Sequence, residues 1–387
     1  MDARDVIVIG GGVIGCAVAW KLATTRDVLV IEKGQIGGEA SGLAVGNVNP
    51  TLSYPDRPTV ASHIRSWFRR YEDAQQVRFT RRPRLELVES GAMEAARDRA
   101  TELRHRGRPV NFLGTETIES TWPVFDLEEY DGALCYGDTG WIDPHLYTQS
   151  LRCQASNRGA EFRTHTPVQA IESVNGHLQV RIPETSVRAT YVVVAAGWRT
   201  RAVLDGLLDL PVRPFLTQCV SLRPASSLPA NFPMGRDPSA NLYFRGDRNG
   251  ELLVGGGRRS SIDDPNRAST GIDAEPQFRR TVAQTLPKFL NGFDNASLVN
   301  GWAGVDGGTP DGHPIITAPS CGPDGLIVAT GFHGGGIRDS PIAASLVQSI
   351  VLDEPVPFDR TAFSLSRFPS RSPDFSISKE YDPSTTT

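Results

Sequence analysis

The N-terminal residues follow an apolar pattern that predicts a β-α-β unit. Residues 5–10 (DVIVIG) form a short β-branched apolar run, which is typical of a buried parallel strand. Residues 11–25 then place small and apolar side chains at helical spacing, and residues 28–32 (VLVIE) form a second apolar run. We therefore predict a strand, a glycine-rich turn, a helix and a strand that together close in about 30 residues.

An arginine-rich segment follows this unit. Residues 57–108 hold 13 arginines and seven acids, and we predict amphipathic helices here, interrupted by a strand at residues 85–90 (LELVES). We interpret the arginine excess as a solvated helix face. The alternative is a docking surface for an anionic partner.

The middle of the chain has the pattern of strands. Residues 161–196 and 213–262 contain apolar and alternating runs separated by turn residues, and Asn175-Gly176 between two such runs predicts a hairpin. From residue 369 the chain is polar and rich in Ser, Thr and Pro, so we predict a disordered tail over residues 369–387.

Composition and charge narrow the class of protein. The 387 residues correspond to two or three domains at about 150 residues each. The 39% hydrophobic content excludes a disordered or collagen-like chain, and the net charge of −4 gives no reason to expect nucleic acid or an anionic membrane as partner.

Cysteine usage and hydropathy predict a cytoplasmic protein. The five cysteines form no CxxC pair and no zinc-type cluster, so we expect a reducing compartment and no metal site. The apolar uncharged run over residues 6–20 is shorter than the ~20 residues of a membrane span, and the acidic N-terminus does not resemble a signal peptide.

The glycines of the first turn predict a dinucleotide site. In Gly10-x-Gly12-x-x-Gly15, the first glycine permits the turn, the second admits a pyrophosphate and the third permits close helix–strand packing. Glu32 ends the next strand, where a carboxylate suits the hydroxyls of a ribose. A glycine-rich turn made only for packing is the alternative. This fingerprint alone fits FAD or NAD.

Six further segments carry a family resemblance, in order along the chain. Together with the first turn they resemble the glycine oxidases, sarcosine oxidases and D-amino-acid dehydrogenases, which are FAD oxidoreductases of the D-amino-acid oxidase-like family. The segments are EKGQIGGEASGLAVGNVNP (32–50), GDTGWIDPHLYTQSL (137–151), YVVVAAGW (191–198), WAGVDGGTPDGHPII (302–316), ATGFHGGGIRDSPIAASLV (329–347) and FSLSRF (363–368).

The resemblance implies an α/β fold with two interleaved domains. One is a Rossmann-like FAD-binding domain over residues 1–80, 140–212 and 300–368. The other is a mixed β-sheet substrate domain over residues 81–139 and 213–299, as in glycine oxidase.

The resemblance also implies FAD and the residues that contact it. FAD is expected to be non-covalent, because Gly304 stands where sarcosine oxidases keep the cysteine that tethers the flavin. The pyrophosphate, adenosine, ribityl chain and flavin ring are assigned to successive motifs. The expected contacts are Gly10, Gly12, Val13, Ile14, Gly15, Glu32, Lys33, Ser41, Gly42, Val168, Ala196, Gly197, Gly331, Gly334, Gly335, Gly336 and Ile337.

The reaction implied by this family is oxidation of a C–N bond. A hydride passes from the carbon beside a neutral amine to flavin N5, and water hydrolyses the resulting imine, so we assign no obligatory catalytic base. The acceptor is O2 or an electron carrier, because Leu253 stands where sarcosine oxidases keep the lysine that speeds reaction with oxygen. The alternatives are an NAD-dependent dehydrogenase, or a non-catalytic or partner-dependent flavoprotein subunit of an amine dehydrogenase complex.

The substrate site departs from the family pattern at Asp306. Relatives that act on amino acids carry an arginine there, and a second one near Gly334, so Arg245 or Arg338 would have to pair with a substrate carboxylate. Otherwise Asp306 contacts a cationic substrate such as an alkylamine or polyamine, or it is a solvated turn acid. The other candidates are Tyr243, His333, Asn47 and Asn49, for which the alternatives are core packing, a backbone role and Asx turns.

Overall fold

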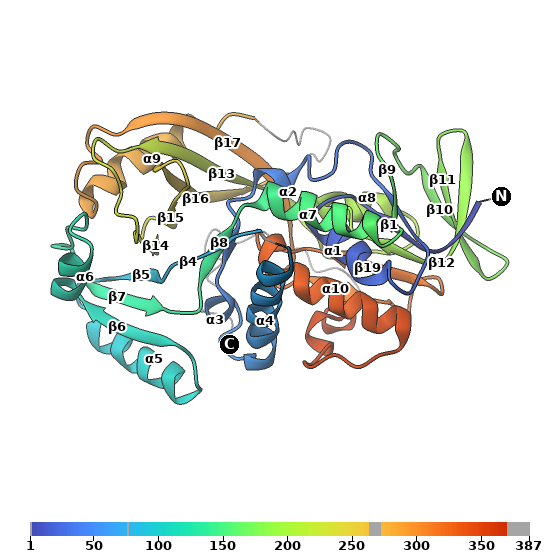
Figure 1. Ribbon diagram of the computed structural model, residues 1–387, viewed down its shortest axis with the longest axis horizontal. Coiled ribbons are helices and arrows are strands. Elements are labelled where there is room, and N and C mark those ends of the chain that lie inside the picture. The colour runs from blue at the N-terminus through green and yellow to red at the C-terminus, as the bar shows by residue number, and fades with distance from the viewer. Residues whose placement is uncertain (1, 76, 263–271, 370–387) are drawn as a thin grey trace.

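The computed structural model describes residues 2–75, 77–262 and 272–369, and Figure 1 shows them as two lobes. Each lobe is built on one eight-stranded sheet, and a three-stranded sheet lies between them in the view of Figure 1. The predicted tail from residue 370 onward lies outside the described residues.

The first sheet is mainly parallel and contains the N-terminal strand. Parallel pairs run in the order β9-β2-β1-β12-β19. Beyond β12, β11 and β10 add to the sheet in antiparallel order, and β18 pairs antiparallel with β19. Its strands are β1 (Asp2–Ile9), β2 (Val28–Ile31), β9 (Glu161–Arg163), β10 (Ala170–Val174), β11 (His177–Ile182), β12 (Thr185–Val194), β18 (Ile315–Thr317) and β19 (Leu326–Thr330).

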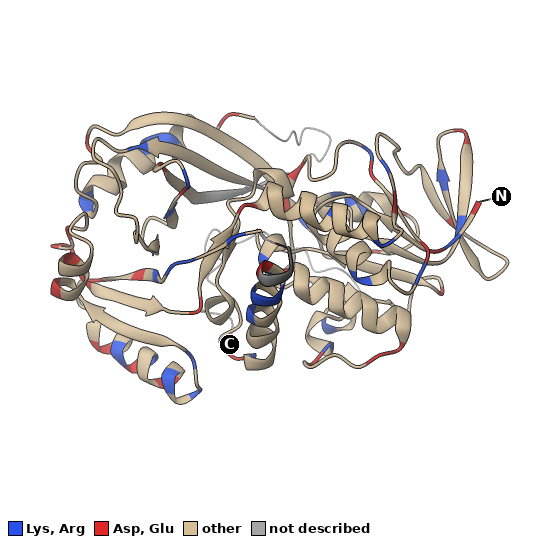
Figure 2. Cartoon of the chain, in the orientation of Figure 1, with Lys and Arg blue, Asp and Glu red and all other residues tan. Residues whose placement is uncertain are grey.

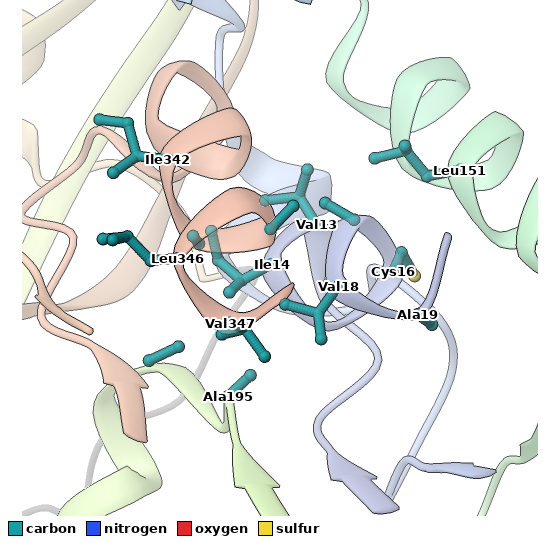
Figure 3. Close-up of a cluster of buried hydrophobic side chains, with 14 of the residues drawn as sticks. Val13, Ile14, Cys16, Val18, Ala19, Leu151, Ala195, Ile342, Leu346 and Val347 are labelled. Carbon is teal, nitrogen blue, oxygen red and sulfur yellow. The ribbon is translucent and has the colours of Figure 1, made fainter. Parts of the chain in front are cut away.

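Helices cover this sheet because its central strands are apolar on both faces. β2 is buried along its whole length, as is the second half of β1. In Figure 3, side chains of α1 (Val13–Leu22) lie against those of α10 (Gly336–Leu352), and both helices belong to one buried cluster with α7 (Pro144–Asn157). This packing fixes the first turns of α1 and α10.

The second sheet forms the other lobe and is antiparallel apart from one pair. Its order is β17-β13-β16-β15-β14-β5-β7-β6, and only β14 and β5 run parallel. The strands are β5 (Arg84–Glu89), β6 (Val110–Gly114), β7 (Tyr130–Tyr136), β13 (Arg213–Arg223), β14 (Met234–Asp237), β15 (Leu242–Gly246), β16 (Leu252–Ser261) and β17 (Ser297–Gly308).

The remaining elements connect and cover the two lobes. The small sheet holds β3 (Asn47–Val48), β8 (Gly140–Ile142) and β4 (Phe79–Arg81). The other helices are α2 (Ala40–Leu43), α3 (Pro50–Ser53), α4 (Pro58–Gln75), α5 (Met93–His105), α6 (Thr115–Thr121), α8 (Thr200–Val203) and α9 (Pro276–Thr285), with 3-10 turns η1 (Gly197–Arg199), η3 (Leu286–Lys288), η4 (Thr361–Phe363) and η5 (Leu365–Arg367).

The arginine-rich segment is confirmed as two helices separated by a strand. α4 and α5 flank β5, which begins one residue before the predicted strand. Figure 2 shows basic residues in blue along both helices. Acids accompany them: Glu102 pairs with Arg99 at 3.0 Å and with Arg106 at 2.7 Å. The predicted hairpin is confirmed as well, since β10 and β11 pair around Asn175 and Gly176.

The predicted α/β fold class is thus confirmed, and its two sheets are interleaved along the chain. The first sheet takes its strands from residues 2–31, 161–194 and 315–330, whereas β17 of the second sheet crosses the expected boundary at residue 300. Across the described ranges, no helix has the length and apolarity needed to span a bilayer.

Candidate active site

A cavity of about 450 Å³ runs past the carboxyl ends of β1 and β2 to the first turn of α10. Ligands of open α/β sheets bind at this edge of the sheet. Most of the expected cofactor contacts line this cavity: Gly10, Gly12, Val13, Ile14, Glu32, Lys33, Ser41, Val168, Ala196, Gly197, Gly334, Gly336 and Ile337.

The first turn has the geometry expected of a phosphate site. Gly10 adopts a φ of 110°, and a Cβ on it would lie 2.4 Å from the Ala195 carbonyl oxygen. A Cβ on Gly15 would lie 1.9 Å from the carbonyl oxygen of Gly10, so this glycine allows α1 to pack on β1. The N-cap residue of α1, Gly12, has no side chain to cap the helix, and Ser41 Oγ accepts one of the free N–H groups, that of Val13, at 2.9 Å. The helix therefore directs its positive end into the cavity.

Glu32 lies where the ribose was expected. Its two carboxylate oxygens accept the N–H groups of Gly11 and Gly34, each at 2.7 Å, and these bonds fix the carboxylate at the cavity wall. A carboxylate held there can accept hydrogen bonds from ribose hydroxyls. Lys33 is paired with Glu39, which also accepts Arg199 at 3.2 Å.

The far end of the cavity is formed by the loop before α10. Three of its residues have a left-handed backbone: Gly331, His333 and Gly334, with φ of 73°, 52° and 83°. Asp306 on β17 fixes this loop, because its Oδ2 accepts the Gly334 N–H and its Oδ1 the Gly307 N–H, both at 2.7 Å.

Not every expected contact lines this cavity. Gly15, Gly42 and Gly331 shape the backbone next to it, and Gly335 lines the neighbouring cavity. The sequence argument missed Trp198 and Arg199, which do line it and directly follow the AAG motif. The turn, the fixed carboxylate and the two helix ends fit a dinucleotide with a flavin at the α10 end.

A second cavity of about 190 Å³ adjoins the first one. The two share a wall made of residues from α2, β17 and the start of α10: Ala40, Ala44, Asp306, Gly334 and Ile337. The predicted substrate-site residues that line this substrate cavity are Asn47, Asn49, Tyr243, Asp306 and His333. Asn47 Oδ1 is buried without a hydrogen-bond partner among the described residues.

Arg245 is the candidate that the structure places outside the substrate cavity. It is 4% exposed, and its guanidinium donates to the Val45 carbonyl oxygen at 2.6 and 2.9 Å. The guanidinium carbon also lies 4.1 Å from the centre of the Trp141 ring. Burial lowers the pKa of Arg245 to about 10. These contacts connect β15 to the segment before β3.

Arg338 does line the substrate cavity, but its guanidinium is already engaged. Nε and Nη2 donate to the Asp339 carboxylate at 2.7 and 2.6 Å, and Nη1 donates to Ser53 Oγ at 2.7 Å. Asp339 is fully buried, so this ion pair is shielded from water. A Cβ on Gly335 would lie 2.2 Å from Arg338 Nη2, and the glycine therefore makes room for the pair.

One row of side chains crosses the second sheet toward the substrate cavity. The strand pairing places six residues side by side, in this order across the sheet: Glu86, Arg236, Tyr243, Gly255, Cys219 and Trp302. Tyr243 lies across Gly255, where a Cβ would be 2.2 Å from the tyrosine hydroxyl. Burial raises the pKa of the Cys219 thiol to about 12, so it stays protonated near neutral pH.

Two arginines of this lining were missed by the sequence argument. Arg84 and Arg236 reach the substrate cavity from β5 and β14. Arg84 opens the run RLELV, in which charged and apolar residues alternate along a fully buried strand. Charged residues at alternate positions of an otherwise apolar run are a signal that could have identified Arg84, whereas the short strand β14 (MGRD) offers no such signal for Arg236.

Two adjoining cavities, one with dinucleotide geometry, define a nucleotide-dependent oxidoreductase. The model of the family described as "FAD dependent oxidoreductase" matches residues 5–349, and the chain belongs to that family. FAD is its cofactor, held without a covalent bond, and the predicted family resemblance is confirmed.

Comparison with individual proteins agrees with this assignment. The chain is 27% identical to the glycine oxidase of Geobacillus kaustophilus over 377 residues, which cover 94% of this chain and 97% of that protein. The crystal structure of glycine oxidase from that organism matches with a TM-score of 0.84 over 95% of this chain and all of that one, at 23% identity. An L-proline dehydrogenase from P. horikoshii matches with a TM-score of 0.83 at 20% identity, covering 95% and 98%.

Proposed function

We propose that this protein oxidises the C–N bond of an amino acid or an amine to an imine, which water then hydrolyses. The observation that carries the proposal is the shared wall between the FAD cavity and the substrate cavity at Asp306, Gly334 and Ile337. A substrate in the second cavity would meet the flavin end of the first. The names of the similar proteins, a glycine oxidase and an L-proline dehydrogenase, support this class of substrate.

Bound FAD supplies the acceptor for a hydride from the carbon next to the nitrogen. The chain contributes a shaped and largely buried cavity in which Tyr243, Asn47 and Asn49 orient the substrate. The uncapped first turn of α10 places the positive end of a helix at the shared wall. A positive potential there stabilises negative charge on the flavin side.

Reduction of the bound flavin by candidate substrates tests the proposal directly. The FAD-loaded protein is mixed without oxygen with D- and L-amino acids, N-methyl amino acids, proline analogues and polyamines, and flavin absorbance is followed. We expect bleaching by at least one amine, with release of ammonia or an amine and a carbonyl product. A flavin that no member of the panel reduces would contradict the proposal and favour a partner-dependent flavoprotein subunit.

The electron acceptor and the compartment belong to the same proposal. We expect O2 or an electron carrier to reoxidise the flavin, and a stopped-flow comparison of air with an artificial acceptor would show which. All five cysteines are free, which supports the expected cytoplasmic location. Fractionation of the source cells would test that location.

A further inference from the structure

Arg84 is a buried cation that has no matching anion in the part of the chain that the structure describes. It is 5% exposed and lines the substrate cavity, and within residues 2–75, 77–262 and 272–369 its Nε has no hydrogen-bond partner. Within the same residues no carboxylate lies within ion-pairing distance of it. Burial lowers the pKa of Arg84 to about 10, which still leaves the guanidinium charged at neutral pH.

The neighbours of Arg84 do not balance its charge. Arg236 and Glu86 lie beside each other in the strand pairing and form an ion pair at 3.7 Å, so their charges balance each other. Glu86 attracts Arg84 through space, whereas Arg236 repels it. Among the described residues, the side chains of Arg84, Arg236 and Glu86 taken together carry one net positive charge.

Arg245, which is buried, and Arg338, which is half-buried, show how the guanidinium is held elsewhere in this chain. Arg245 donates to a backbone carbonyl, and Arg338 forms a two-bond fork with Asp339. A buried guanidinium without partners costs several kcal/mol of folding free energy. A residue kept in that state at the wall of a cavity is therefore best explained by a partner that arrives from outside.

The strand order places Arg84 away from the flavin side. β17, which carries Asp306 at the shared wall, and β5, which carries Arg84, are five strands apart, or about 24 Å along the curved sheet. Neither Arg84 nor Arg236 lines the FAD cavity. A ligand that spans the substrate cavity would therefore place one end at Asp306 and Gly334 and its other end at Arg84.

We propose that Arg84, assisted by Arg236, binds a carboxylate of the substrate at the end of the cavity opposite the flavin. The proposal rests on the proposed function and names its substrate class: an amine whose carboxylate lies at the far end of the molecule from the C–N bond that is oxidised. The anion would be held from β5 and β14, not from position 306, where this chain has an acid. A guanidinium with open N–H groups can bind a carboxylate through two parallel hydrogen bonds.

Calorimetric titration of the FAD-loaded protein with butanoate and with butanamide tests the subsite without turnover. We expect butanoate to bind more tightly than butanamide, and Arg84→Gln to weaken butanoate binding about 10- to 100-fold while butanamide is unaffected. The butanoate affinity of Arg84→Lys should lie between those of the wild type and Arg84→Gln, since lysine keeps the charge and loses the two-bond fork. Arg104→Gln, on the exposed face of α5, is the control for losing one positive charge. Its affinity for butanoate should equal that of the wild type.

Thermal unfolding of the same variants separates a binding role from a structural one. Removing an uncompensated buried charge should leave the melting temperature of Arg84→Gln equal to or above that of the wild type. A lower melting temperature with unchanged butanoate affinity would show that Arg84 is structural and overturn the proposal. Equal binding of butanoate and butanamide by the wild type would overturn it as well.

Turnover distinguishes failure of the subsite from failure of the proposed function. The amine panel is extended with amines that carry a carboxylate at the far end of a chain, each compared with its methyl ester, and we expect Arg84→Gln to raise KM for the acids much more than it lowers kcat. If esters and acids reduce the flavin equally well in both proteins, the subsite is wrong and the function stands. If no amine reduces the flavin but butanoate binding depends on Arg84, the function is wrong and the anion site stands.

Discussion

Asp306 has a role that neither of the sequence interpretations contained. It was expected either to face a substrate cation or to be a solvated turn acid. In the structure it lines both cavities, and its two oxygens accept backbone N–H groups from β17 and from the loop before α10. The carboxylate therefore fixes the loop that forms the flavin end of the site.

Replacing Asp306 should therefore affect FAD binding. Asp306→Ala removes two hydrogen bonds to a charged acceptor, each worth about 1.5–3 kcal/mol, so we expect the Kd for FAD to rise at least about tenfold. Fluorescence titration of the apoprotein with FAD measures it, and Asp306→Asn, which keeps one acceptor oxygen, should fall in between. An unchanged Kd together with a selective loss of cationic substrates would show that the acid contacts substrate instead.

Which arginine faces the substrate was the part of the site that residue types could not predict. Arg245 and Arg84 both begin or end short apolar runs, yet Arg245 is engaged with Val45 and Arg84 opens into the cavity. The direction of each side chain depends on strand register, and β5 pairs in parallel with β14, which is far away in sequence. Such register is set by tertiary contacts and not by the local pattern.

At the scale of elements, the turn between β1 and α1 was predictable because its signal is local. Gly10, Gly12, Gly15 and Glu32 lie within one β-α-β unit. Gly10 makes the expected turn, and Gly15 allows the expected close packing of helix on strand. The three-stranded sheet of β3, β8 and β4 was not predicted, because strands of two or three residues leave no periodic pattern to recognise.

Adding one methyl group to Gly15 should separate α1 from β1. The new Cβ would lie 1.9 Å from a backbone oxygen that cannot move independently, and such overpacking costs about 1–3 kcal/mol or more. We expect Gly15→Ala to lower the melting temperature and the FAD content of the purified protein. In Gly114→Ala the added atom meets nothing within 4 Å, so this variant is the matched control. Equal FAD content in the two variants would contradict this account of the turn.

At the scale of the whole molecule, the cavity assigned to FAD is lined by residues of both lobes. Most residues that line the FAD cavity belong to the first sheet and its helices. Asp306, which also lines it, belongs to β17 of the second sheet. This arrangement follows from the order of the motifs along the chain, because the last motifs of the first lobe come after the strands of the second lobe in the sequence. The motifs could be predicted from the sequence, and the shared wall between the cavities could not.

FAD should accordingly stabilise the whole chain. A ligand that binds only the folded state adds about 2.7 kcal/mol to the free energy of unfolding when its free concentration is roughly 100 times its Kd. We expect the melting temperature of the apoprotein to rise with added FAD and to rise less with FMN, which lacks the adenosine half. Differential scanning calorimetry measures the effect. A melting temperature that is indifferent to FAD would mean that the cavity does not bind it in the folded state.

Gly255 has a consequence for how this enzyme could diverge. Tyr243 can lie flat against the sheet only because the neighbouring strand has no side chain at that point. Any larger residue at position 255 would push the Tyr243 ring into the substrate cavity. The size of substrate that fits is thus limited by Gly255, a residue that does not contact the substrate. One substitution at Gly255 would be enough to narrow the range of substrates and would leave the residues around the flavin unchanged.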